Sequence, residues 1–152
     1  MPAPHDPALT AIYARAAYRV RLPRGGHACI RCGAPLPVAL RRLLPATDAP
    51  WAFVTACNPH SRRLPSAVNR QRQRRLLRWL RDAHPHVDIR AGVGTGAAWR
   101  ESSLFVVGIT PPACEELMRR FQQNAVILGH GDSNARLAWN PIVTPTPPEM
   151  PT

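Results

Sequence analysis

Two residues of this sequence could carry proton-transfer chemistry. Glu101 has no other carboxylate near it along the chain, and Trp99 stands where it could restrict water around that side chain. A desolvated carboxylate can act as a general acid or base, and the alternative is a structural ion pair with Arg100 or another arginine. His60 is the second candidate, because histidine exchanges protons near neutral pH. No nucleophilic triad accompanies either residue, so the sequence predicts a candidate acid or base without predicting a reaction.

Amide and hydroxyl side chains accompany these two residues at the ends of the same segments. Such groups, with one aromatic ring, are suited to bind a small polar or anionic ligand such as a nucleotide or metabolite. Two of them have structural alternatives: Asn69 could brace the turn at 58–61, and the Gln-Asn pair at 123–124 could cap a helix C-terminus. The candidate ligand-binding residues are Asn58, Ser61, Asn69, Trp99, Ser103, Gln123 and Asn124.

The elements that must position these residues follow from apolar periodicity and turn signals. From about residue 51 the pattern predicts strands at 51–57, 87–91, 102–109 and 125–128, with helices at 66–83 and 112–121. This β-α-β-β-α-β order is typical of the ferredoxin-like fold, an antiparallel sheet with helices on one face. A helix at 8–14, a hairpin at 18–22 and 28–32, and a helix at 37–44 would extend or cover the sheet. One extra C-terminal strand is expected at 135–139.

In that α+β fold the candidate residues come together. The strand 51–57 would run antiparallel to the strands that begin near 102 and 125. Its end, with Asn58 and Ser61, would therefore share one sheet edge with Glu101 and Gln123. Residues 92–96 are glycine-rich and would form a connection that approaches the same edge. They do not open a helix, so they are not a dinucleotide-binding fingerprint.

The helix 66–83 has an apolar side and a basic side. At 100° per residue, Leu76 and Leu80 point one way, and Asn69 falls between their directions. Ser66 is the expected N-cap. The opposite side carries arginines, either as a solvated face or as a phosphate-binding stripe: Arg70, Arg74, Arg78 and Arg81.

The net charge of the chain is +11, and every one of its 20 cations is an arginine. The absence of lysine excludes Schiff-base chemistry and a P-loop lysine. The arginine excess is also what codon bias in a GC-rich genome would produce, so we do not expect specific nucleic-acid binding from charge alone. Cys29 and Cys32 resemble half of a zinc site, but no second pair follows. We therefore expect no metal and no cofactor.

We expect one cytoplasmic domain at 8–140, between a disordered tail at 1–7 and a proline-rich, disordered tail at 141–152. No apolar run reaches the ~20 residues of a membrane span, and no signal peptide is evident. The oligomeric state is not predicted.

Four motifs in order resemble a known family. They are T-A-x-N-P-x-S from Thr55, S-x-x-N from Ser66, W-x-E-x-S-x-x-V-x-G-I from Trp99, and F-x-Q-N-A from Phe121. Together they resemble a small bacterial family of uncharacterised proteins, domain of unknown function 3293, over roughly residues 10–139. The resemblance implies no activity, but its motifs contain the same candidate residues.

The sequence therefore predicts a binding module for a small polar or anionic ligand at one sheet edge. The first alternative is an enzyme that uses Glu101 or His60 as its general acid or base. The second is a protein-interaction domain in which the polar residues form a structural network.

Overall fold

The computed structural model describes residues 7–141 of the chain. The tails expected at 1–7 and 141–152 lie outside this range apart from one residue each. Pro7 begins the first helix, and residue 141 is the last residue described. The elements are α1 (Pro7–Arg15), β1 (Ala17–Arg21), β2 (His27–Ile30), α2 (Val38–Arg41), β3 (Pro50–Val54), the 3-10 turn η1 (Pro59–Ser61), α3 (Ser66–Ala83), β4 (Asp88–Thr95), β5 (Arg100–Val107), α4 (Pro111–Arg120), β6 (Ala125–His130) and β7 (Arg136–Trp139).

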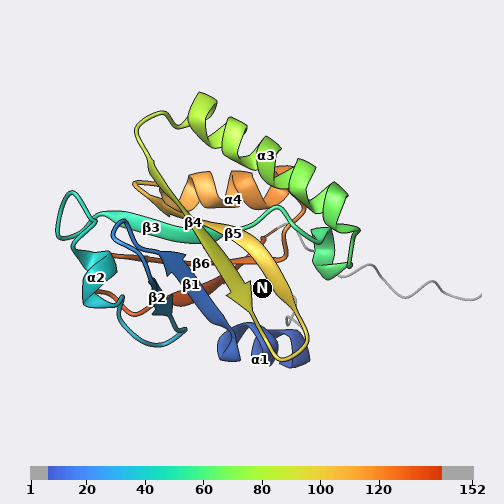
Figure 1. Cartoon of the computed structure of the whole chain (residues 1–152), viewed down its shortest axis with the longest axis horizontal. Helices are drawn as coiled ribbons and strands as arrows, with labels where there is room; N and C mark the ends of the chain where they lie inside the picture. Colours follow the sequence, from blue (N-terminus) through green and yellow to red (C-terminus); the bar gives the residue numbers. More distant parts are fainter. Residues whose placement is uncertain (1–6, 142–152) are drawn as a thin grey trace, which may run out of the picture.

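The expected ferredoxin-like fold is wrong. The sheet has seven antiparallel strands in the order β2-β1-β4-β5-β3-β6-β7, and it curls into a half-barrel. The hairpin β1–β2 joins the sheet through β4 instead of covering it, with Val20 opposite Gly92. The helices also do not share one face: α3 and α4 lie on one side of the sheet and α1 on the other (Figure 1).

The convex face of the sheet is closed by α3 and α4. Leu76 and Leu80 of α3 and Leu117 of α4 are fully buried against Val106 of β5. The N-terminus of α4 is capped by Thr110, whose side-chain oxygen accepts from the backbone N–H of Ala113 at 3.4 Å, and two prolines occupy its first turn. Periodicity predicted both helices because each needs an apolar stripe to pack on the sheet.

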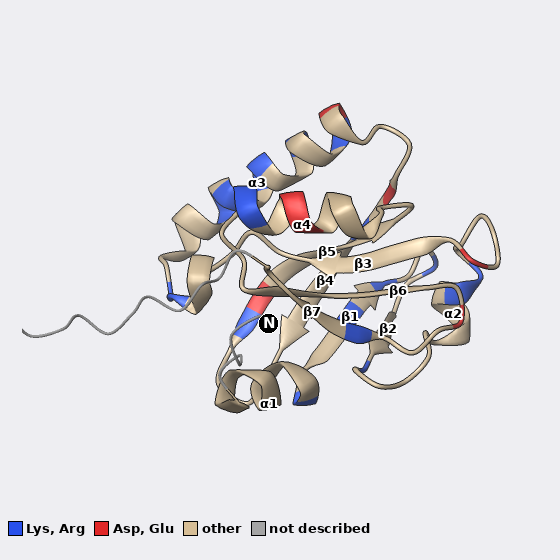
Figure 2. Ribbon diagram, turned by 180° about the vertical axis from the view of Figure 1, so that it is seen from behind, with Lys and Arg blue, Asp and Glu red and all other residues tan. Residues whose placement is uncertain are grey.

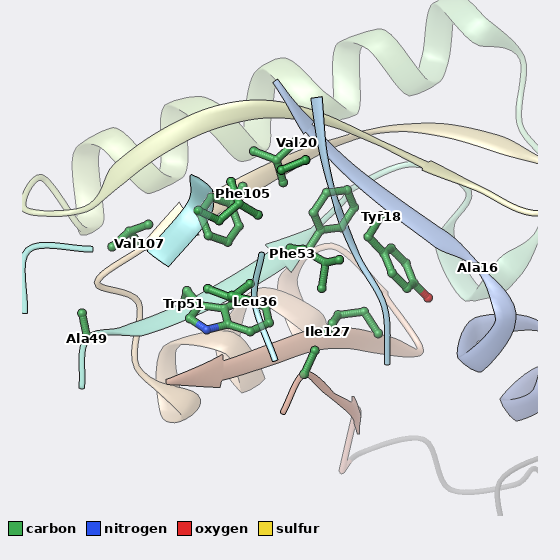
Figure 3. Close-up of a cluster of buried hydrophobic side chains, with 14 residues drawn as sticks. Ala16, Tyr18, Val20, Leu36, Ala49, Trp51, Phe53, Phe105, Val107 and Ile127 are labelled. Carbon is green, nitrogen blue, oxygen red and sulfur yellow. The ribbon is translucent and has the colours of Figure 1, made fainter. Parts of the chain in front are cut away.

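The concave face holds a second core. Trp51 and Phe105 pack there with ring centroids 5.8 Å apart (Figure 3). Leu40 of α2 belongs to the same cluster and is fully buried. Tyr18 and Phe53 meet edge to face, with ring centroids 5.3 Å apart. The two aromatic pairs fill the inside of the curl.

The glycine-rich stretch is part of strand β4, and this corrects the expectation of a connection at 92–96. Gly92 and Gly94 lie on the concave side. A Cβ atom at Gly92 would come within 2.7 Å of the Phe53 ring and 2.8 Å of the Arg19 carbonyl oxygen. Glycine is therefore required for the close approach of β1 and Phe53, which lets the sheet curl at this strand.

Other bounds shift in ways that matter for the site. Strand β3 ends at Val54, so residues 55–57 belong to the turn that follows it. Helix α3 begins at Ser66 with Pro65 as N-cap, so the expected Ser66 cap is wrong. The four arginines expected on one side of α3 are exposed. Figure 2 marks the arginine positions of this helix in blue. Within residues 7–141, no helix is long and apolar enough to cross a membrane.

Candidate functional site

A cavity opens at one end of the concave face, where β3, β5 and β6 meet α1. Its volume is about 50 Å³, within about 510 Å³ of empty space that extends to the solvent. The lining comprises Tyr13, Tyr18, Phe53, Val54, Thr55, Asn58, Ser61, Gly94, Trp99, Glu101, Ser103, Gln123, Ala125, Val126, Ile127 and Leu137. A wider hollow adjoins it and shares five of these residues, with Leu9, Ile12, Arg63 and Ala98 completing its wall. We call the first the inner cavity and the second the outer hollow.

Aromatic rings form much of the inner wall. Tyr18 and Phe53 project from β1 and β3 into the curl (Figure 3). Trp99 stands on the hairpin between β4 and β5 and folds back over the strand. A Cβ atom at Gly94 would lie 3.2 Å from its ring, and one at Gly96 would lie 2.1 Å from its Nε1 atom. The glycines thus make room for Trp99 as a wall of the cavity.

The turn after β3 holds an unusual backbone. Asn58, His60 and Ser61 all have positive φ angles, of 49°, 53° and 60°. Among residues 7–141, the remaining non-glycine residue with positive φ is Gln122, whose carbonyl oxygen accepts a 2.7 Å hydrogen bond from the His60 N–H. Left-handed backbone costs non-glycine residues free energy, so surrounding contacts must hold this turn.

Asn69 supplies the main contact with that turn. Its Oδ1 accepts from the Asn58 N–H at 2.9 Å, and its Nδ2 donates to the Asn58 Oδ1 at 2.9 Å. The Leu64 N–H also donates to the Asn58 Oδ1, at 2.9 Å. Because two donors occupy the Asn58 oxygen, its NH₂ group is left to face the cavity side. Asn69 therefore braces the turn, which is one of the two roles expected for it. It does not line the inner cavity, as a ligand-binding role there would require.

Glu101 receives that NH₂ group. A hydrogen bond from the Asn58 side chain favours the charged carboxylate, but burial outweighs it and raises the pKa of Glu101 above the ordinary value of 4.5. Glu101 is half-buried, and no cation among residues 7–141 lies within ion-pair distance of it. The structural ion pair considered from the sequence is therefore not present in this part of the chain.

Ser61 links three separate segments at the mouth. Its Oγ lies 2.8 Å from the Tyr13 hydroxyl of α1 and accepts from Asn124 Nδ2 at 2.9 Å. The Tyr18 hydroxyl donates to the Tyr13 carbonyl oxygen at 2.7 Å. Burial raises the pKa of both tyrosines, so they remain neutral hydroxyl groups near neutral pH. These contacts fix α1 over the turn.

Gln123 and Ser103 complete the interior. Gln123 is buried, and its Nε2 donates to the Cys57 and Phe121 carbonyl oxygens, each at 3.1 Å. Ser103 is also buried, and its Oγ donates to the Glu101 carbonyl oxygen at 3.1 Å. The donor hydrogens of these two buried side chains are thus already committed to backbone carbonyl oxygens.

The structure does not bring every candidate residue to the cavity. His60 is exposed and lines neither the inner cavity nor the outer hollow. Asn124 contacts Ser61 without lining the inner cavity. Cys29 and Cys32 are half-buried free thiols, and residues 7–141 contain no group of three or more His, Cys, Asp or Glu side chains placed to hold a metal.

Two residues that contribute to the site, Tyr13 and Arg72, were not predicted from the sequence. Tyr13 lies in a helix whose position over the sheet has no local signal. Arg72 donates to the Ala56 carbonyl oxygen at 2.6 Å and to that of Phe121, and so ties α3 to the turn after β3 and to the end of α4. A signal for Arg72 existed: three residues after Asn69, it lies only about 60° from it around the helix, toward the apolar side.

The comparisons with known proteins give one match. The family described as Protein of unknown function (DUF3293) matches residues 54–126, which contain the strained turn, α3 with its Asn69 brace, Trp99, Glu101 and Gln123. No curated protein and no solved structure matches the chain. The resemblance to the DUF3293 family of proteins of unknown function is therefore confirmed over residues 54–126.

Proposed function

We propose that this protein is a cytoplasmic binding module for a small polar ligand held in the inner cavity. The single observation that carries the proposal is the solvent-connected cavity itself, bounded by Trp99, Glu101 and Gln123. Ligand sites are concave, largely apolar and furnished with a few placed polar groups, and this cavity has that composition. Its small volume restricts the buried part of a ligand to a few non-hydrogen atoms, with the remainder in the outer hollow.

The strained turn supports the same proposal. Asn58, His60 and Ser61 hold left-handed backbone that a simple connection between strand and helix does not need. Backbone strain persists where surrounding structure maintains it, and such residues cluster at ligand sites. Here the turn places Asn58 and Ser61 on the cavity wall. A purely structural network would explain the hydrogen bonds between Asn58 and Asn69, but it would not require an open cavity beside them.

Retained small molecules test this proposal. The protein is purified under native conditions and denatured, and mass spectrometry identifies the molecules released. Ala125→Leu places a larger side chain on the cavity wall, whereas Ala91→Leu makes the same change at an exposed position of β4. We expect a molecule that is retained by the wild type and by Ala91→Leu but lost from Ala125→Leu. Equal retention by all three, or no retained molecule, would contradict the proposal.

A second candidate function is an enzyme that uses Glu101 as its acid or base. The observation that favours it is the raised pKa of a half-buried carboxylate with no cation paired to it among residues 7–141. Perturbed carboxyl groups of this kind are common in active sites. The test is to incubate any identified ligand with the wild type and with Glu101→Gln. Conversion by the wild type alone would favour the enzyme, and unchanged ligand with both would favour the binding module.

A further inference from the structure

The inner cavity departs from the charge of the chain as a whole. The protein carries 20 arginines and a net charge of +11, yet none of the residues between 7 and 141 that line the inner cavity is an arginine or a histidine. Within that range, the one readily ionised group of the lining is the carboxylate of Glu101. The arginine of the outer hollow, Arg63, does not line the inner cavity. The charge of the inner cavity is therefore opposite to that of the protein.

Three polar side chains of the cavity offer a ligand hydrogen-bond acceptors. Gln123 has used its NH₂ group on two backbone carbonyl oxygens, so it offers a ligand its Oε1 oxygen. Ser103 has used its hydroxyl hydrogen on the Glu101 carbonyl oxygen, so it offers lone pairs. Glu101, when ionised, accepts only. A ligand that satisfies these groups must supply several hydrogen-bond donors.

The remaining wall is aromatic. Tyr13, Tyr18, Phe53 and Trp99 line the same cavity as these polar groups. Ring faces attract cations and repel anions, most strongly where water is excluded. Together with the acceptors and a single carboxylate, they form surroundings that favour a positive charge with N–H donors.

We propose that the inner cavity binds the ammonium group of a small primary amine, with Glu101 as its counter-ion. This inference rests on the proposed binding function and names its ligand class. A primary ammonium has three donors, which match the Glu101 carboxylate and the Gln123 and Ser103 oxygens. It is also compact: a water molecule needs roughly 10–15 Å³ of such space, and the cavity holds only a few such volumes.

The test uses three probes of similar size and different charge: ethylammonium, ethanol and acetate. Each is titrated into the full-length protein, and NMR follows the backbone amide signals of Ser103 and Gln123. We expect ethylammonium to shift these signals with an affinity at least about tenfold above that of ethanol, because charge-assisted hydrogen bonds exceed neutral ones. Acetate should leave the signals unchanged.

Two variants locate the effect. Glu101→Gln keeps the shape of the side chain and should abolish the preference for ethylammonium over ethanol. Glu116→Gln makes the same chemical change at the exposed ion pair with Arg120 and should bind the probes as the wild type does. The backbone signals of each variant show that it remains folded.

The outcomes separate this inference from the proposal on which it rests. Binding of ethanol or acetate as tight as that of ethylammonium would overturn the ammonium assignment and leave a binding cavity in place. Equal ethylammonium binding by Glu101→Gln would also overturn it. If none of the probes binds, both the ammonium inference and the proposed binding function fail.

Discussion

The two ends of the concave face use the same device for different purposes. At the closed end, beside α2, Trp51 packs over Gly129, where a Cβ atom would come within 2.6 Å of its ring. At the open end, Trp99 packs over Gly94 and Gly96 in the same way. Trp51 is 1% exposed and surrounded by apolar side chains, whereas Trp99 is half-buried and borders the cavity. The packing of a tryptophan ring over a glycine therefore completes the hydrophobic core at the closed end and forms the cavity wall at the open end.

The two ends differ in the interactions that hold them, because hydrogen bonds take the place of apolar packing at the open end. The closed end is held by buried apolar surface, including Ile30, Leu36 and Leu40 at 0–1% exposure. The open end is held by hydrogen bonds among side chains and backbone, chiefly those of Asn58 with Asn69. Hydrogen bonds can keep a turn in place without filling the space beside it, so this end can be both ordered and hollow.

Truncation of the two tryptophans gives the largest expected contrast. Trp51→Ala should lower the free energy of unfolding by about 3–5 kcal/mol, because it empties a closed part of the core. Trp99→Ala should cost about 1–2 kcal/mol, because its ring is already partly solvated. Urea unfolding followed by circular dichroism measures both. Equal losses would show that the open end is packed as tightly as the closed one.

Substitution of the facing glycines sharpens the same comparison. Gly129→Ala should cost about 1–3 kcal/mol by overpacking, since Trp51 has no free space to move into. Gly96→Ala meets the Trp99 Nε1 atom at 2.1 Å, but Trp99 can swing outward, so the stability loss should be smaller. Thermal unfolding compares the two variants, and the indole N–H signal of Trp99 should shift in Gly96→Ala. A larger stability loss for Gly96→Ala would refute this account of the open end.

The sequence predicted that Asn58 and Gln123 lie near each other because their proximity depends on strand pairing alone, and Asn69 reaches Asn58 from the start of the helix that follows β3. Strand β3 runs antiparallel to β5 and β6, so its end lies beside their beginnings whatever joins the sheet at its margins. The curl was missed because it depends on Gly92 and Gly94, and glycines in sequence indicate a loop more readily than a strand that bends. Tyr13 was missed because nothing local specifies where α1 docks.

The Asn69 brace should contribute less to stability than Trp51, about as much as Trp99, and more than its exposed neighbours. Asn69→Ala leaves the Asn58 N–H without its partner and removes one donor from the Asn58 oxygen, at a cost of about 1–2 kcal/mol. Gln71→Ala, on the exposed side of the same helix, should stay within about 0.5 kcal/mol of the wild type. Chemical denaturation measures the two losses. Similar values for both would show that hydrogen bonds do not hold the open end.

Removal of the Glu101 charge should have the smallest effect and the opposite sign. Burial raises the pKa of Glu101 in the folded protein above the ordinary 4.5, so the folded state binds more protons than the unfolded state between those two pKa values. Stability from this group is complete below pH 4.5 and is lost as pH rises through the folded-state pKa. Glu101→Gln removes that loss, so it should stabilise the protein at neutral pH and lose this advantage in acid.

Melting temperatures of wild type and variant across pH 4 to 8 test that sign, with Glu116→Gln as control. Glu116 lies in an exposed ion pair at 3.1 Å from Arg120, so its variant should be slightly less stable at neutral pH, by about 0.3–0.5 kcal/mol. If Glu101→Gln raises the melting temperature at neutral pH while Glu116→Gln lowers it, the charge of Glu101 destabilises the folded protein. Stabilisation by removal of the charge is expected where a carboxylate is retained to bind a ligand. A Glu101→Gln variant that is less stable than the wild type at neutral pH would instead make Glu101 part of the structural network at the open end.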